Sequence, residues 1–234
     1  MLALDWRGHG DTDWVGAGGY YHFPDYAADL AGIVHALGRR VALVAHSMGA
    51  GGAVLYAGTA PAMVTALVCV DALGPPDMSP DDVPRRYATW LADLEKVAAR
   101  ARSTVTLAEA TTRLRERFLN FPDAIAAHMA LHGTRAENGG RTWKFDPLHQ
   151  TTAPTPYDVG QARLFWERIA CPVLYVAGAD SRYRLAADEE ADRLARLRAD
   201  KIVLPGVAHH PHLEAPERLA GVLVDFLRRS RCAD

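Results

Sequence analysis

The feature that most constrains the fold is an alternation of short apolar runs with amphipathic helical patterns. The apolar runs occupy residues 1–4, 41–45, 66–70, 172–176 and 201–204. Runs of this length, separated by helices, are typical of the strands of a parallel sheet, because parallel strands need long crossover connections. The sequence therefore predicts an α/β fold, with helices on both faces of a mostly parallel sheet.

Two helices of this pattern are well defined at their ends. Residues 25–37 carry apolar side chains at helical spacing, and Gly38 follows in the position that commonly ends a helix. Residues 216–229 place apolar side chains on one stripe and begin with Pro216, which suits a first helical turn. Both helices are expected to pack on the sheet.

The segment from 74 to 167 interrupts this alternation. It shows no strand-like run, whereas Ser79 before a proline and Thr106 three residues before a glutamate are helix-start patterns. We therefore expect a helical insertion between two strands, which would form a lid over the carboxyl ends of the sheet. The predicted division is a core of residues 1–73 and 168–234 and a lid of residues 74–167.

Composition sets limits on partners and location. The chain has 234 residues, 49% of them hydrophobic, and a net charge of −2, which gives no basic footprint for nucleic acid or an anionic membrane. Its first residues lack the basic and apolar regions of a signal peptide, and no apolar stretch is long enough to span a bilayer. We expect a cytoplasmic protein that acts on a small molecule and needs no cofactor.

The strongest chemical signal is the segment 41–50, Val-Ala-Leu-Val-Ala-His-Ser-Met-Gly-Ala. Ser47 ends a predicted strand and opens a helix rich in small residues, which is the setting of a nucleophile elbow. Ala45 stands where the G-x-S-x-G pattern has its first glycine. The N–H group of Met48 would then serve as an oxyanion-hole donor. The alternative is a serine that only caps the helix.

A serine nucleophile needs a base, and three histidines follow the last predicted strand. His209 occupies the place of the base in loops of the form G-H-x-x-H-x-E, with Ala208 in place of the glycine. His210 is expected to face solvent, and His212 is expected to shape the loop. A metal cluster is the other interpretation of three close histidines, but no HExxH or acidic ligand pattern accompanies them, so no metal is predicted.

The base in turn needs a carboxylate. Asp180 follows the strand at 172–176 and precedes the histidine loop, so it is the preferred partner of His209. Asp71 ends the strand at 66–70 and is the alternative acid. An aspartate in such a loop also commonly caps a turn.

With these serine, histidine and aspartate segments, the chain resembles the α/β-hydrolase superfamily, and it is similar to serine-hydrolase-like proteins and their bacterial relatives. Residues 5–10, Asp-Trp-Arg-Gly-His-Gly, match the D-x-R-G-x-G stretch that follows the fourth strand of that fold. The resemblance implies three further strands ahead of residue 1 and a loop with a second oxyanion donor. We therefore expect an N-terminally truncated chain, and losing one donor costs about a hundred- to a thousandfold in rate.

The expected activity is hydrolysis of a small ester, a thioester or a carbon–carbon bond beside a ketone, through an acyl-serine intermediate. Epoxide hydrolysis and dehalogenation are disfavoured, because they need a carboxylate in place of Ser47. His46, Trp143 and Phe145 are candidate pocket residues, although both aromatic residues also suit the interior of the lid. The alternative function is that of a non-catalytic binding protein or an inactive fragment.

Overall fold

The structure is a computed structural model that describes residues 1–99, 104–118 and 120–231. Its contacts divide the chain into two compact units. Unit 1 comprises Met1–His22 and Ser79–Pro156, and unit 2 comprises Phe23–Met78 and Tyr157–Asp234.

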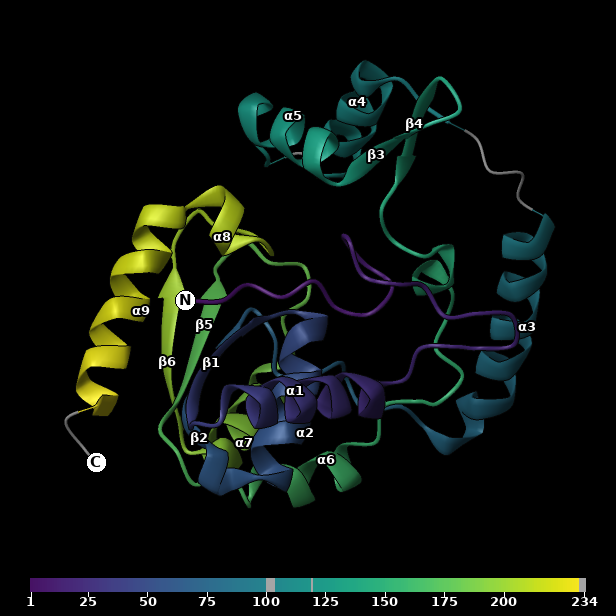
Figure 1. The fold of residues 1–234 in the computed structure, drawn as a ribbon. Helices are drawn as coiled ribbons and strands as arrows, with labels where there is room; N and C mark the ends of the chain where they lie inside the picture. Colours follow the sequence, from purple (N-terminus) through teal and green to yellow (C-terminus); the bar gives the residue numbers. More distant parts are fainter. Residues whose placement is uncertain (100–103, 119, 232–234) are drawn as a thin grey trace. The chain divides into compact units, whose positions relative to one another are not determined.

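Unit 2 contains a parallel sheet in the order β1-β2-β5-β6 (Figure 1). The strands of the sheet are β1 (Val41–His46), β2 (Val64–Val70), β5 (Val173–Gly178) and β6 (Ala199–Leu204). These are the four apolar runs after the first, so the prediction of a parallel sheet is confirmed for them. Because all four strands run the same way, the loops that follow β1, β2, β5 and β6 leave from the same edge.

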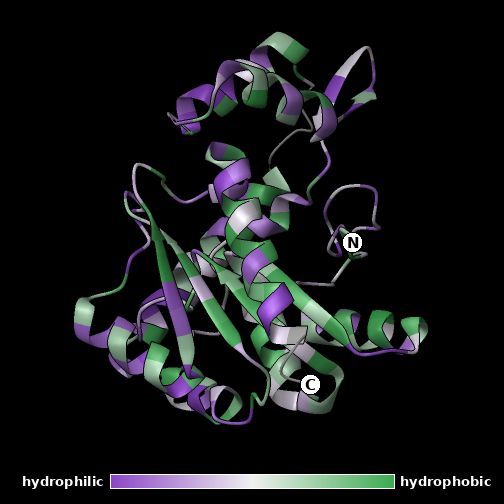
Figure 2. Ribbon diagram, turned by 90° about the vertical axis from the view of Figure 1, so that its left-hand side faces the viewer, coloured by the Kyte–Doolittle hydropathy of each residue, from purple (hydrophilic) through white to green (hydrophobic). Residues whose placement is uncertain are grey.

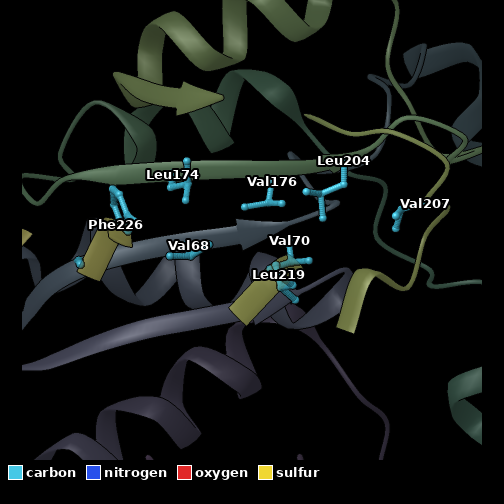
Figure 3. Packing of buried hydrophobic residues seen from close by; sticks show 9 residues of the cluster. Val68, Val70, Leu174, Val176, Leu204, Val207, Leu219 and Phe226 are labelled. Atoms are coloured by element: carbon cyan, nitrogen blue, oxygen red, sulfur yellow. The ribbon is translucent and has the colours of Figure 1, made fainter. Parts of the chain in front are cut away.

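One face of this sheet packs on the C-terminal helix α9 (Pro216–Arg231). Figure 3 shows side chains of β2 and β5, Val68 and Leu174 among them, beside Leu219 and Phe226 of α9. All of these side chains are buried, which removes apolar surface from water at roughly 25 cal/mol per Å². The apolar stripe predicted for this helix therefore contributes to the core of unit 2.

The remaining helices of unit 2 complete the layers around the sheet. They are α1 (Phe23–Leu37), α2 (Met48–Thr59), α6 (Val159–Trp166), α7 (Ala187–Leu197) and the short α8 (Pro211–Glu214). Helix α2 lies on the face opposite α9 (Figure 1) and packs against both α1 and α6. Gly58 of α2 approaches the backbone of Phe165 in α6 so closely that a Cβ atom would not fit. In Figure 2 the helices carry both hydrophilic and hydrophobic residues, as expected for helices with one face on a core.

Unit 1 contains the helices α3 (Val83–Ala99), α4 (Leu107–Arg117) and α5 (Asp123–His132). The helix-start patterns function as predicted: Ser79 accepts a hydrogen bond from the Asp81 N–H group, and Thr106 and Glu109 form a complete capping box. The prediction that this segment has no strands is wrong. An antiparallel hairpin joins β3 (Thr134–Glu137) to β4 (Gly140–Trp143), turning at Asn138 and Gly139, which both have positive φ.

The first apolar run is also predicted wrongly. Residues 1–4 lie outside the strands of the described chain, and Met1, Leu2 and Leu4 are largely exposed. A short apolar run becomes a strand only when a neighbour supplies its hydrogen-bond partners, and strand β1 pairs only with β2 among the described residues. Hydrophobicity alone was therefore an insufficient signal at this position.

The boundaries of the two units differ from the predicted domains at three places, of which the shortest is residues 74–78, which belong with unit 2. Residues 1–22 belong with unit 1, where the Tyr21 hydroxyl donates a hydrogen bond to the buried carboxylate of Asp146 at 2.8 Å. Residues 157–167 belong with unit 2, because α6 packs on α2. Among the described residues, no helix combines the length and the apolar content needed to cross a membrane.

Candidate active site

Ser47 lies at a sharp turn between β1 and α2. Its backbone has φ 50° and ψ −124°, a strained conformation for a residue with a side chain, and its N–H group donates to the Val70 carbonyl at 3.1 Å. Strain of this kind costs about 1–3 kcal/mol and persists only where the surroundings impose it. The small residues of α2 allow close packing here, and Gly51 contacts the ring of Phe23. This is the geometry predicted for an elbow.

His209 bridges Ser47 and a buried carboxylate. The Ser47 hydroxyl donates to Nε2 of His209 over 2.8 Å, and Nδ1 of His209 donates to Oδ2 of Asp71 over 2.7 Å. Ser47 follows β1, Asp71 follows β2, and His209 follows β6. The three side chains meet because these strands end at the same edge of one sheet. The chain of hydrogen bonds can move a proton from the serine to the imidazole while the aspartate stabilises the resulting charge.

Asp71 is held by more than its contact with the histidine. Its Oδ1 accepts a hydrogen bond from the Gly178 N–H group at 2.9 Å, and Oδ2 accepts a second from the Ser181 hydroxyl at 2.5 Å. Burial opposes ionisation of Asp71, but the hydrogen bonds from His209, Ser181 and Gly178 outweigh it and hold the pKa of this carboxyl below its ordinary value. Asp71 is therefore an ionised, fixed acceptor.

The preferred acid of the sequence prediction, Asp180, does not contact His209. Its side chain is exposed, and its N–H group donates to the Val207 carbonyl at 2.9 Å. Strand β5 pairs with β2, and the loop after β5 directs the Ser181 hydroxyl to the carboxylate of Asp71. The structure thus places the alternative acid, Asp71, where Asp180 was expected.

The loop that carries His209 is fixed by Glu214, which the sequence reasoning did not single out. One carboxylate oxygen accepts from the Ala208 N–H group at 2.8 Å and the other from the His210 N–H group at 2.9 Å. These are the amides on either side of His209. An acidic residue five positions after the histidine, at the end of a short helix, was the available signal.

Two further residues near His209 were missed. Ser181 supports Asp71, and Tyr183 places its ring 4.3 Å from the imidazole while remaining 55% exposed. Arg182 lies over the ring of Tyr183, with Cζ 4.9 Å from its centroid. These three consecutive residues follow β5, and no motif marked them in the sequence.

The other histidines gather around the same loop. The Nε2–H group of His46 donates to the His209 carbonyl at 2.6 Å, and the ring of His46 lies 5.3 Å from that of His210 and 4.6 Å from that of His212. Burial lowers the pKa of His46 to about 3 and that of His210 to about 4, and it also lowers the pKa of His212. The prediction that His210 faces solvent is wrong, since this residue is half-buried, whereas His212 is exposed.

The remaining candidate residues are Met48 in unit 2 and the aromatic pair Trp143 and Phe145 in unit 1. Met48 begins α2, so its N–H group belongs to the first turn, where amides have no acceptor within the helix. Trp143 belongs to unit 1, where it packs against the cluster of Val105, Ala110 and Leu114 and stacks on Phe145 with 5.9 Å between ring centroids. Trp143 therefore contributes to the interior of unit 1.

Comparisons with known proteins agree with this architecture. A family model described as "Alpha/beta hydrolase family" matches residues 1–222. The "Serine hydrolase-like protein" of Danio rerio is 25% identical over 97% of this chain and 73% of its own length. The "2-(acetamidomethylene)succinate hydrolase" of Mesorhizobium japonicum is 29% identical over 97% of this chain and 77% of its own. The crystal structure of a hypothetical protein from Pseudomonas aeruginosa PAO1 is 27% identical, with a TM-score of 0.85, and the match covers 97% of this chain and 81% of that one.

Proposed function

This chain belongs to the alpha/beta hydrolase family, and from that premise we propose that it is a serine hydrolase acting on small carbonyl substrates. Ser47 is the nucleophile, His209 the general base and Asp71 the acid that orients the histidine. The observation that carries the proposal is the continuous chain of hydrogen bonds from the strained Ser47 to the buried Asp71. A serine that only caps a helix needs neither contact.

In the first half of the proposed reaction, Ser47 Oγ attacks the carbonyl carbon and its proton moves to Nε2 of His209. The negative charge that develops on the substrate oxygen is stabilised by the N–H group of Met48, at the start of α2. Collapse of the tetrahedral intermediate expels the leaving group, which takes the proton from His209, and an acyl-serine remains. Asp71 stays ionised throughout and stabilises the imidazolium.

In the second half, water attacks the acyl-serine. His209 removes a proton from the water and returns it to Ser47, which restores the enzyme and releases an acid. Hydrolysis is supported by the relatives, one named a serine hydrolase-like protein and the other a 2-(acetamidomethylene)succinate hydrolase, whereas the substrate class of esters, thioesters or carbon–carbon bonds beside a ketone stays a prediction. That residues 74–167 act as a lid, and that His46, Trp143 and Phe145 line a pocket, stay predictions.

The test is hydrolysis of p-nitrophenyl acetate by the chain and by two serine variants. Ser47→Ala removes the nucleophile, whereas Ser230→Ala removes a hydroxyl in α9 that, within the described part of the chain, bonds the Phe226 carbonyl. We expect Ser230→Ala to retain turnover and Ser47→Ala to lose it by at least about a thousandfold. A fluorophosphonate should likewise label the wild-type chain and Ser230→Ala but not Ser47→Ala.

Two outcomes would contradict the proposal. Turnover that survives Ser47→Ala would mean that another group carries the reaction. A folded wild-type chain with neither turnover nor labelling would instead favour a non-catalytic binding protein.

A further inference from the structure

The site holds more imidazoles than a serine hydrolase uses. Only His209 has a part in the proposed reaction, yet one ring nitrogen from each of His46, His209 and His210 lies within 4.8 Å of one from the other two. The ring of His209 lies 4.8 Å from that of His46 and 4.8 Å from that of His210. These residues come from the end of β1 and from the loop after β6, so the sheet itself brings them together.

The hydrogen bonds define where the lone pairs are. His46 donates from Nε2 to the His209 carbonyl, which leaves the lone pair of a neutral His46 on Nδ1. His209 donates from Nδ1 to Asp71, which leaves its lone pair on Nε2. A histidine whose Nδ1–H group is held by a carboxylate, with Nε2 available, is the arrangement commonly found in metal-binding histidines. Burial also favours the neutral imidazole, which is the form that binds metals.

We propose that His46, His209 and His210 form a site for a divalent transition-metal ion, such as Zn²⁺, Ni²⁺ or Cu²⁺, and that an ion bound there blocks hydrolysis. Imidazole ligands suit these ions, whereas Mg²⁺ and Ca²⁺ prefer oxygen ligands. The ion is an inhibitor and not a cofactor. Its inhibitory effect rests on the proposed function, but its binding does not.

The geometry of such a site is close to what Zn²⁺ requires. Zinc–nitrogen bonds of about 2.0–2.1 Å at tetrahedral angles place ligand nitrogens about 3.3 Å apart. The three nitrogens lie within 4.8 Å of one another, at most about 1.5 Å beyond this spacing, so binding requires the side chains to rotate toward the ion. The fourth position is left for water or for Ser47 Oγ, which lies 2.8 Å from Nε2 of His209.

Inhibition follows from competition for one lone pair. Nε2 of His209 must accept the proton of Ser47 during attack, and an ion coordinated to that atom prevents the transfer. The contact between Asp71 and Nδ1 can remain, so the ion replaces only the hydrogen bond that Nε2 accepts from the Ser47 hydroxyl. Removal of the ion by a chelator should restore full activity.

The binding test uses a Ser47→Ala chain, which retains all three histidines and cannot turn over substrate. We expect calorimetry to show one Zn²⁺ bound for each chain, and expect His46→Asn or His210→Asn in the same background to weaken binding at least about tenfold. The control is a double variant, His128→Asn with His132→Asn, which removes two exposed neighbouring histidines of α5. It should leave the affinity unchanged.

A second binding measurement does not depend on substitutions. Co²⁺ added to the wild-type chain should give the intense visible absorption of a four-coordinate ion, and Zn²⁺ should displace it. Affinity that is lost in the His128 and His132 variant, or kept in both His46→Asn and His210→Asn, would overturn the proposed site.

The inhibition test measures p-nitrophenyl acetate hydrolysis with and without Zn²⁺, comparing each variant with its own metal-free rate. The half-inhibitory concentration of Zn²⁺ should rise at least about tenfold in His210→Asn and stay unchanged in the His128 and His132 variant. Mg²⁺ should not inhibit any of these chains. Hydrolysis that persists while Zn²⁺ is bound would overturn the inhibitory effect. A wild-type chain without hydrolysis would contradict the proposed function, and the binding test would still decide the site.

Discussion

Asp71 combines burial with an unusual backbone. Its side chain is 2% exposed, its φ is 49°, and its N–H group donates to the Val176 carbonyl at 2.7 Å. Gly178, the last residue of β5, and Ser181, in the loop after it, both donate hydrogen bonds to the Asp71 carboxylate. Backbone strain therefore occurs at both Ser47 and Asp71, at the ends of two neighbouring strands.

Replacing each of the two candidate acids by asparagine separates their roles. Asp71→Asn keeps the shape but allows the wrong tautomer of His209, so kcat should fall by about a thousand- to ten-thousandfold. Asp180→Asn changes an exposed side chain and should leave kcat within about a factor of three. Steady-state hydrolysis of p-nitrophenyl acetate by the two variants measures this. A larger fall in kcat for Asp180→Asn than for Asp71→Asn would instead indicate that Asp180 is the acid.

The sequence predicted the contact of Ser47 with His209 but not its acid partner. Ser47 and His209 lie in local patterns whose flanking strand and helix can be read from the residues alone. Asp71 and Asp180 both follow strands, and both satisfy the order of serine, acid and histidine. The choice between them depends on the direction of a side chain after a strand end, which no periodicity reports.

At the scale of the secondary-structure elements, the pairing of strands determined which apolar runs joined the sheet, and hydrophobicity alone did not. The four later apolar runs became strands because each has a neighbour, whereas residues 1–4 have no strand partner among the described residues. The hairpin of β3 and β4 was missed because its strands, Thr-Arg-Ala-Glu and Gly-Arg-Thr-Trp, are mostly polar. Its turn dipeptide, Asn138-Gly139, was a signal that could have found it.

Two glycine substitutions test the packing of α2 on α6. A Cβ atom at Gly58 would lie 2.5 Å from the Phe165 carbonyl oxygen and 2.8 Å from its Cα, whereas one at Gly32 of α1 would meet nothing within 4 Å. Gly58→Ala should therefore lower the free energy of unfolding by about 1–3 kcal/mol. Gly32→Ala should raise it by about 0.5–1 kcal/mol. Urea denaturation of both variants measures the difference, and equal effects would argue against close packing of these helices.

At the scale of the whole molecule, unit 1 joins two distant parts of the chain. The ring of His149 lies 3.9 Å from that of Tyr21 and 3.9 Å from that of His9, and Tyr21 bonds Asp146. Burial, together with the positive charge of a protonated His9, lowers the pKa of His149 to about 4. The neutral imidazole is therefore the form that this packing stabilises.

This packing predicts a loss of stability in mild acid. The unfolded chain protonates His149 near pH 6.5 and the folded chain only near pH 4, so stability is complete above pH 6.5 and decreases as the pH falls toward 4. Between pH 7 and pH 5 this group contributes a loss of about 1 kcal/mol, because the imidazole is only partly buried and solvent screens part of the effect. Urea denaturation at the two pH values should show a smaller loss for His149→Phe, and an unchanged loss for His35→Gln on the exposed face of α1. An equal loss in His149→Phe would contradict the assignment.

The division into two units has a consequence for how such a chain can diversify. Ser47, Asp71 and His209 all lie in unit 2, and the chain leaves that unit after Met78 and returns at Tyr157. A hydrogen bond from the Val159 N–H group to the Asp77 carboxylate joins exit and return at 3.3 Å. Recombination could therefore exchange residues 79–156 without altering the triad, but only if the first 22 residues were inherited with them, since both pieces build unit 1. Unit 1 and the unit that carries Ser47, Asp71 and His209 would then evolve as separate modules, each encoded in two parts of the chain.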